Sequence, residues 1–236
     1  MIGATFLLAG LVKGVIGMGL PTVAMGLLAL VLPPAEAAAI LVVPSLVTNV
    51  WQLLAGPRFA ALARRLWPMM LGVVAGTIAG AGVLAGNVAG LAKIGLGVAL
   101  MAYALVGLGG IRLAIDPRHE GWIGPLIGVT TGLITGGTGV FAIPAVPYLQ
   151  AIGLEKDDLI QALGLSFTVS TMALGLGLLR VDAWSASALW VSMLALVPAL
   201  VGMQAGQWLR LRIAAATFRR VFFAGLLLLG ATLALA

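Results

Sequence analysis

The sequence predicts an all-α integral membrane protein in which eight hydrophobic segments form two inverted repeats of four. The first observation is composition: 62% of the 236 residues are hydrophobic and only 8% are charged, against about 25% charged residues in soluble domains. The second is length, because apolar runs of about 20 residues, enough to span a bilayer, recur along the chain. The third is the distribution of basic residues, which is considered below.

Several classes of function are excluded by composition. The chain has no cysteine, so disulfides, thiolate metal sites and cysteine nucleophiles are absent. An enzyme would need a nucleophile with a base, or metal ligands, yet the only histidine, His119, lies in a charged loop. We therefore expect no enzyme, no metal and no cofactor. The net charge of +6 is attributed to cytoplasmic loops rather than to a nucleic-acid partner.

Proline, glycine and charged residues divide the chain into eight predicted segments. The first and the fifth are too long for a simple span, and glycine and proline interrupt both near the middle. The predicted segments are 2–32, 35–56, 67–86, 90–112, 122–152, 157–179, 184–208 and 216–236.

The two halves of the chain, 1–114 and 115–236, resemble each other, which predicts two transmembrane repeats within one integrated membrane domain. The alternative is that glycine-rich membrane sequences align by chance. The alignment places Gly10, Gly14, Gly17 and Gly19 over Gly128, Gly132, Thr135 and Gly137, Ser45 and Asn49 over Ser166 and Ser170, and Gly72, Gly76 and Gly80 over Pro198, Gly202 and Gly206.

Basic residues favour one topology of the repeats. If segments 1 and 5 each cross the membrane, the basic residues divide six against six. If both segments are hairpins of two half-helices, only Lys93 and Arg180 lie on one side, as the positive-inside rule requires. Each repeat then crosses an odd number of times, so the repeats are inverted and both termini are outside. The ten residues on the other side are Arg58, Arg64, Arg65, Arg112, Arg118, Lys156, Arg210, Arg212, Arg219 and Arg220.

The interruptions of segments 1 and 5 are the predicted binding site. Broken helices at matching places in inverted repeats mark the binding sites of transporters, and the freed N–H groups and positive dipole ends of half-helices attract anions. The alternative is close helix packing at these glycines. The candidate residues are Gly17 and Gly19 in the first break, 17–21, and Thr135, Gly136, Gly137, Thr138 and Gly139 in the second, which Pro144 follows.

Lys13 lies inside the apolar run of segment 1, and no acidic residue lies in the apolar part of any segment. Intramembrane charges are expensive and mark substrate pathways by default, so a lone cation beside half-helix ends predicts a small-anion site. The alternative is a lysine that snorkels to the interface. The repeat-equivalent residue, Thr131, is a neutral candidate ligand, so the anion site is expected to be asymmetric.

Polar residues form a stripe on segment 2 and an equivalent face on segment 6. Ser45, Thr48, Asn49 and Gln52 lie on one helical face, and Ser166 and Ser170 lie at the matching positions. Hydroxyls and amides donate hydrogen bonds to oxyanions without adding charge, so Ser45, Asn49, Gln52, Ser166 and Ser170 are candidate substrate ligands. The alternative is hydrogen bonding between helices.

Other glycines are assigned to helix packing. Gly72, Gly76 and Gly80 keep a spacing of four residues, as do Gly82, Gly86 and Gly90. Small residues at this spacing allow helices to approach closely.

The chain resembles the TauE/SafE type of sulfite exporter-like permeases over almost its whole length. The resemblance lies in the glycine-rich break after G-x-x-x-G in each half, in the connection Pro33-Pro34-Ala35-Glu36-Ala37, and in the duplicated layout. The second break keeps the family pattern, whereas Leu20 and Pro21 replace two glycines in the first. The resemblance implies transport of sulfite, thiosulfate, sulfoacetate and related sulfonates.

The residues and the resemblance together predict a transporter of small anions, located in a bacterial inner membrane. An anion channel on the same scaffold and a structural subunit that needs a partner are the alternatives. The expected partners are a small anion and the lipid bilayer. The oligomeric state is left open, a homo-oligomer included.

The topology has a direct test because the chain carries no native cysteine. Cysteines introduced by Gly86→Cys and Arg219→Cys are expected to react with membrane-impermeant reagents from opposite sides of the membrane. Labelling of both from one side would contradict the hairpin topology.

Overall fold

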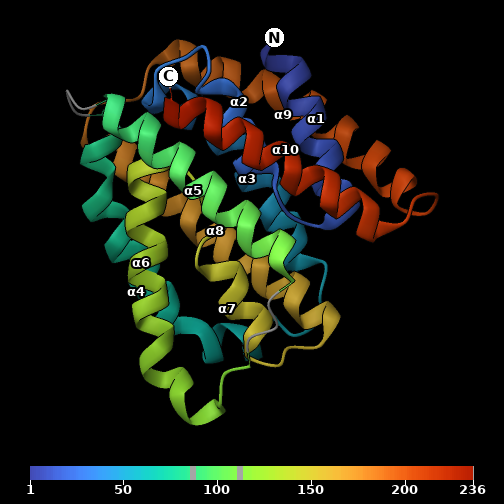
Figure 1. The fold of residues 1–236 in the computed structure, drawn as a ribbon. Helices are drawn as coiled ribbons and strands as arrows, with labels where there is room; N and C mark the ends of the chain where they lie inside the picture. Colours follow the sequence, from blue (N-terminus) through green and yellow to red (C-terminus); the bar gives the residue numbers. More distant parts are fainter. Residues whose placement is uncertain (86–88, 111–113, 236) are drawn as a thin grey trace.

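The computed structural model describes residues 1–85, 89–110 and 114–235. In these ranges the secondary structure consists of helices joined by loops, without strands. Six of the described helices are long and apolar enough to cross a membrane. Figure 1 shows them packed side by side in one bundle. These six are α3 (Pro34–Leu54), α4 (Phe59–Ala85), α5 (Ala89–Gly109), α8 (Lys156–Arg180), α9 (Ala186–Arg210) and α10 (Ala215–Leu235).

The first and fifth predicted segments are each divided into two helices, as expected. Segment 1 forms α1 (Ile2–Ile16) and α2 (Leu20–Leu28). Segment 5 forms α6 (Glu120–Thr138) and α7 (Ala145–Ala151), after a 3-10 turn, η1 (Pro117–His119). The main difference from the predicted bounds is the start of α4, which lies well before residue 67. Charged residues end a membrane span but need not end its helix.

The first interruption is made by two glycines in the left-handed region. Gly17 has φ 78° and Gly19 has φ 102°, a conformation that only glycine adopts readily. The N–H of Gly17 closes α1 by donating to the carbonyl of Lys13. Helix α2 then starts at Leu20, and Pro21 lies in its first turn, where a missing N–H costs nothing.

The second interruption lies later in the chain than predicted. Thr135, Gly136, Gly137 and Thr138 are helical and belong to α6, so the assignment of these four residues to the break was wrong. The turn comes at Gly139, with φ 72°, and the non-helical stretch extends to Pro144. Within α6, the hydroxyls of Thr135 and Thr138 donate to the carbonyls of Thr131 and Ile134, one turn earlier, so both threonines fit the helix.

Segment 5 begins and ends at the same end of the molecule. The guanidinium of Arg65, near the start of α4, donates to both carboxylate oxygens of Glu120, at 2.9 and 2.6 Å. The same group donates to the carbonyl of Ile152, directly after α7, at 2.8 Å. The N–H of Ile115 also donates to the carbonyl of Ala151. Helices α6 and α7 therefore form a hairpin that opens at this end.

Two pairs of helices pack in parallel through glycines. On α1 and α9, a Cβ added at Gly10 or Gly14 would lie 2.1 or 2.2 Å from the carbonyl oxygens of Ala199 and Met203. On α6 and α4, a Cβ added at Gly128 or Gly132 would lie 2.1 or 2.3 Å from the carbonyl oxygens of Met69 and Val73. Backbones this close leave room for no side chain, so these glycines hold the two pairs together.

The packing role assigned to Gly72, Gly76 and Gly80 is confirmed, because added Cβ atoms would lie 2.3–2.7 Å from carbonyl oxygens of α6. The same assignment was wrong for Gly82 and Gly90, where an added Cβ meets no atom of the described residues within 4 Å. Gly86 lies outside the described residues, as does Arg112.

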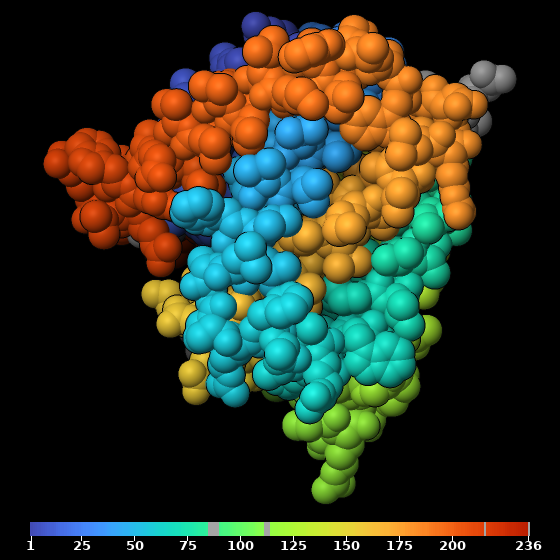
Figure 2. Space-filling view, turned by 180° about the vertical axis from the view of Figure 1, so that it is seen from behind, coloured from blue at the N-terminus to red at the C-terminus, as the bar shows by residue number. Residues whose placement is uncertain are grey.

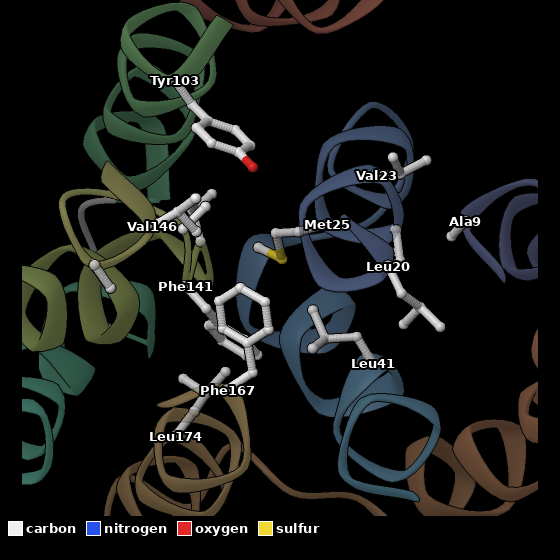
Figure 3. Packing of buried hydrophobic residues seen from close by; sticks show 14 of the residues in the cluster. Ala9, Leu20, Val23, Met25, Leu41, Tyr103, Phe141, Val146, Phe167 and Leu174 are labelled. Carbon is white, nitrogen blue, oxygen red and sulfur yellow. The ribbon is translucent and has the colours of Figure 1, made fainter. Parts of the chain in front are cut away.

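Helix α2 meets the second interruption in an apolar core. Figure 3 shows Met25 of α2 close to Phe141 of the second interruption and to Phe167 of α8. The two phenylalanine rings lie 6.5 Å apart, and a Cβ added at Gly139 would lie 2.9 Å from the Met25 sulfur. The hairpins thus pack on each other through side chains that exclude water from the centre of the bundle.

The remaining helices cover this centre. Helix α3 packs on α8 and α9, α4 packs on α8, and α5 packs on α10. Seen from behind, the end of α3 lies between α8, α4 and α9, and the α9–α10 connection projects to one side (Figure 2).

The close helix contacts at glycines predict that substitution lowers stability at some glycines and not at others. Gly128→Ala is expected to lower the melting temperature of the purified protein, because the new methyl group would overlap the Met69 carbonyl, and overpacking costs about 1–3 kcal/mol. Gly121→Ala on the same helix is the control, since an added Cβ there meets no atom within 4 Å. Equal melting temperatures for the two variants would contradict close packing of α4 and α6.

Candidate functional site

Lys13 lies inside the bundle rather than at an interface. Its side chain is 4% exposed, and its ammonium donates a hydrogen bond to the Oδ1 atom of Asn49 on α3. The N–H of Gly17 donates to the carbonyl of the same lysine, so the charge lies within one turn of the first interruption.

Asn49 connects Lys13 to α8. Its Nδ2 atom lies 3.5 Å from the Oγ1 atom of Thr171, which donates to the carbonyl of Phe167 at 2.6 Å. A chain of polar groups therefore runs from α1 through α3 to α8. Each of the three side chains is buried.

Five buried hydroxyls have no hydrogen-bond partner among the described residues, although buried polar groups are normally paired. Four of them are residues that the sequence predicts as ligands, and the fifth, Thr77 of α4, is new. All five side chains are 0% exposed. They are Ser45, Thr77, Thr131, Ser166 and Ser170.

The packing of α3 on α8 brings three of these hydroxyls, those of Ser45, Ser166 and Ser170, to similar heights along the two helices. The two helices are antiparallel, since Gly175 faces Val42 and Gly164 faces Leu53. Asn49 and Thr171 meet between these contacts, and Ser45, Ser166 and Ser170 lie within two turns of them. Helix α6, which carries Thr131, also packs on α8.

Other predicted ligands are already used in hydrogen bonds or in backbone packing. The amide of Gln52 donates to the carbonyl of Ile160 at 2.8 Å and joins α3 to α8. The hydroxyls of Thr135 and Thr138 bond to the backbone of α6 and of Val140. The backbone of Gly136 is packed against Thr77, whose carbonyl an added Cβ would approach to 2.3 Å.

The break glycines lie among apolar side chains: a Cβ added at Gly19 would meet Phe222 and Val12, and one added at Gly139 would meet Met25. Gly19 caps α2, and no side chain caps the N-terminus of that helix, so its first N–H groups are without a side-chain acceptor. Gly139 ends α6 by donating to the carbonyl of Thr135 at 2.8 Å. Gly137 makes only ordinary contacts, with an added Cβ 3.9 Å from Val83.

Sequence reasoning missed Thr77 and did not select Thr171. Thr77 is a single hydroxyl in an apolar helix, and no polar stripe marks it. It lies between Gly76 and Gly80, where α4 contacts α6, and its carbonyl lies 3.8 Å from a Cβ added at Gly177 of α8. Only the tertiary packing shows that its side chain is enclosed.

The electrostatics of the region follow from one charge. Among the described residues, Lys13 is the only charged side chain that is buried. All seven acidic residues lie within the described ranges, at exposed or half-buried positions. The interior is therefore locally positive, and its other polar groups are neutral.

Two cavities are lined by other residues. One, of about 50 Å³, lies beside Arg65, Glu120 and Tyr148. The other, of about 330 Å³, is an open apolar groove between α4 and α8 that includes Trp67 and Val169. In the described ranges, no group of three His, Cys, Asp or Glu side chains is placed to hold a metal ion.

These features define an all-helical, multi-pass membrane protein with two interrupted segments and a buried cation on the first of them. The chain belongs to the family described as "Sulfite exporter TauE/SafE", whose model matches residues 2–233. This finding confirms the resemblance seen in the sequence, and the family is one of membrane exporters. No curated protein and no solved structure matches the chain.

The hydrogen bond between Lys13 and Asn49 has a measurable consequence. Asn49→Leu is expected to destabilise the protein by at least about 2 kcal/mol, because it leaves a buried charged donor without its acceptor. Thermal unfolding of the purified protein measures this loss.

The double variant Lys13→Met, Asn49→Leu is the control for that loss. It removes the unpaired charge as well, so it is expected to be more stable than Asn49→Leu alone. In a double-mutant cycle, such a departure from additivity measures the interaction between the two residues. Strictly additive losses would contradict the interaction.

Proposed function

We propose that this chain is a secondary transporter that exports small sulfur-containing oxyanions or sulfonates, of the sulfite, thiosulfate and sulfoacetate type. The observation that carries the proposal is the buried Lys13, which has a neutral amide as its partner and unpartnered hydroxyls on neighbouring helices. A buried cation without a carboxylate is costly, and a bound anion would neutralise it.

The repeats are proposed to be residues 1–114 and 115–236, related by inversion. The mirrored glycine contacts support this, because α1 packs on α9 as α6 packs on α4. A Cβ added at Gly202 meets the carbonyl of Leu7, and one added at Gly72 meets that of Pro125. These contacts favour a register one helical turn away from the sequence alignment, with Pro68 rather than Gly72 equivalent to Pro198.

The directions of the helices support inversion. Helix α4 runs parallel to α6 and to α8, since Gly177 faces Ala81 and the groove between them joins Trp67 to Leu165. Helix α9 returns from α8 and runs parallel to α1. Helices α1 and α6 therefore run in opposite directions, and in Figure 1 the start of α6 lies far from the N-terminus.

Alternating access follows from this arrangement as a mechanism. In inverted-repeat transporters, one repeat rocks against the other around a fixed site at the membrane midplane. Lys13 would attract the anion, and Asn49, Ser45, Thr131, Ser166 and Ser170 would orient it. Export of an anion would be favoured by an outside-positive potential by about 2.3 kcal/mol per charge for each 100 mV.

Both termini are proposed to lie outside the inner membrane of a bacterial cell. Figure 1 shows them near the same end of the molecule. Arg58, which pairs with Asp158 at 3.2 Å, and Arg65, which pairs with Glu120, are assigned to the cytoplasmic end under the positive-inside rule.

Sulfite flux into proteoliposomes that hold only this protein tests the proposal. We expect labelled sulfite to enter faster when unlabelled sulfite is present on the opposite side, because a carrier returns faster when loaded. Flux without this trans-stimulation would favour a channel, and absence of flux from folded protein would reject sulfite as a substrate.

Lys13→Ala is the informative variant in the same assay. It is expected to raise the half-saturating sulfite concentration at least about tenfold, since a buried ion contact is worth more than 1.4 kcal/mol, without preventing folding. Lys93→Ala is the matched control, because Lys93 lies near the start of α5, outside the polar region. Unchanged affinity in Lys13→Ala would remove the lysine from the site.

A further inference from the structure

The buried charge also bears on which anions the site accepts, an inference that rests on the proposed transport function. Lys13 is the only buried charge among the described residues, and the group that its ammonium contacts is the neutral amide of Asn49. We propose that the site selects anions with a single negative charge, such as hydrogen sulfite or a monosulfonate. Dianions such as sulfate, thiosulfate and sulfoacetate are then poor ligands, so the cargo class proposed above narrows to its singly charged members.

The argument is one of charge balance in a medium of low dielectric constant. A monoanion beside the Lys13 ammonium leaves the buried region neutral. A dianion would leave one uncompensated negative charge, and taking such a charge out of water is expensive. Hydroxyl donors reduce this cost but add no positive charge.

No second cation is placed to compensate a dianion in the described part of the bundle. Arg65 is bound to Glu120 and to the carbonyl of Ile152 at the open end of the second hairpin. Arg58 pairs with Asp158. The position equivalent to Lys13 in the second repeat is Thr131, which is buried, neutral and unpartnered.

Hydrogen-bond capacity is sufficient for one oxyanion. The ammonium of Lys13 has three donors, of which one is used on Asn49. The Nδ2 group of Asn49 is held only by a long contact of 3.5 Å to Thr171. Ser45, Ser166, Ser170 and Thr131 each bring a hydroxyl without another partner. One half of the site thus supplies the charge, and both halves supply neutral donors.

Methanesulfonate and sulfate separate charge from shape, because both are small tetrahedral sulfur anions, with three and four sulfur-bound oxygens, but carry one and two charges. We expect methanesulfonate to raise the melting temperature of the purified protein at constant ionic strength, kept with potassium gluconate. A ligand that binds the folded protein stabilises it by an amount that grows with the logarithm of the ligand concentration over Kd. The concentration that half-saturates the protein is expected to be at least about tenfold lower for methanesulfonate than for sulfate. Lys13→Gln should abolish the effect, and Lys93→Gln should leave it intact.

A second cation at the equivalent position should reverse the preference. Thr131→Lys is expected to bind sulfate more tightly than methanesulfonate. Thr130→Lys is the matched control, because Thr130 is exposed on the same helix, and its preference should match that of the unmodified protein. If Thr131→Lys does not fold, the comparison of Lys13→Gln with Lys93→Gln decides.

The outcomes distinguish this inference from the proposed function. Sulfate binding that equals or exceeds methanesulfonate binding, and that Lys13→Gln abolishes, would overturn charge selection but keep the anion site. Stabilisation by neither anion would overturn both.

Discussion

The backbone at membrane depth is the constraint on which the architecture depends. In a bilayer, an interrupted helix frees N–H and carbonyl groups that water cannot satisfy, so such a break is tolerated only under a cover of protein or beside a polar cavity. Both interruptions of this chain are enclosed: Gly19 and Gly139 are buried, the first against Phe222 and Val12 and the second against Met25. The long helices α3, α4, α8 and α9 supply the walls of this enclosure.

The enclosure depends in turn on close helix contact. Lipid provides little hydrophobic drive for helices to associate, so packing and hydrogen bonds must hold them. Glycines on both partners let α1 meet α9, and α4 meet α6, at backbone distance. Gly97 and Gly230 do the same where α5 crosses α10. Each half-helix is thereby fixed against a full span, which keeps the interruptions in register with the polar faces of α3 and α8.

Hydropathy and charge predicted much of the fold, because spans and interruptions are encoded locally. The position of the second break was harder to predict from the sequence. Thr135 to Thr138 has the composition of a breaker, but threonine hydroxyls can bond within the helix, and Gly136 is needed for contact with α4. The register between repeats was also ambiguous, since glycines recur every four residues and a shift of one turn aligns almost as well.

The candidate site was predicted unevenly for a related physical reason. A charge in an apolar run is rare enough to single out Lys13 without tertiary information. Whether a polar side chain is free depends instead on partners far away in the chain. The amide of Gln52 donates to the carbonyl of Ile160, whereas the hydroxyl of Ser45 has no hydrogen-bond partner among the described residues. Thr77 gave no signal at all, because one threonine in a membrane helix ordinarily bonds its own backbone.

The asymmetry between Lys13 and Thr131 is the feature that a duplicated scaffold does not explain by itself. A second buried lysine at position 131 would add another desolvated charge to the interior, and its desolvation would destabilise the unliganded protein. One lysine paired with Asn49 keeps that cost limited while retaining a net positive charge in the interior. In the proposed inverted scaffold, the single charge makes the two half-sites unequal, so that one repeat would attract the anion and the other would contribute neutral donors to hold it.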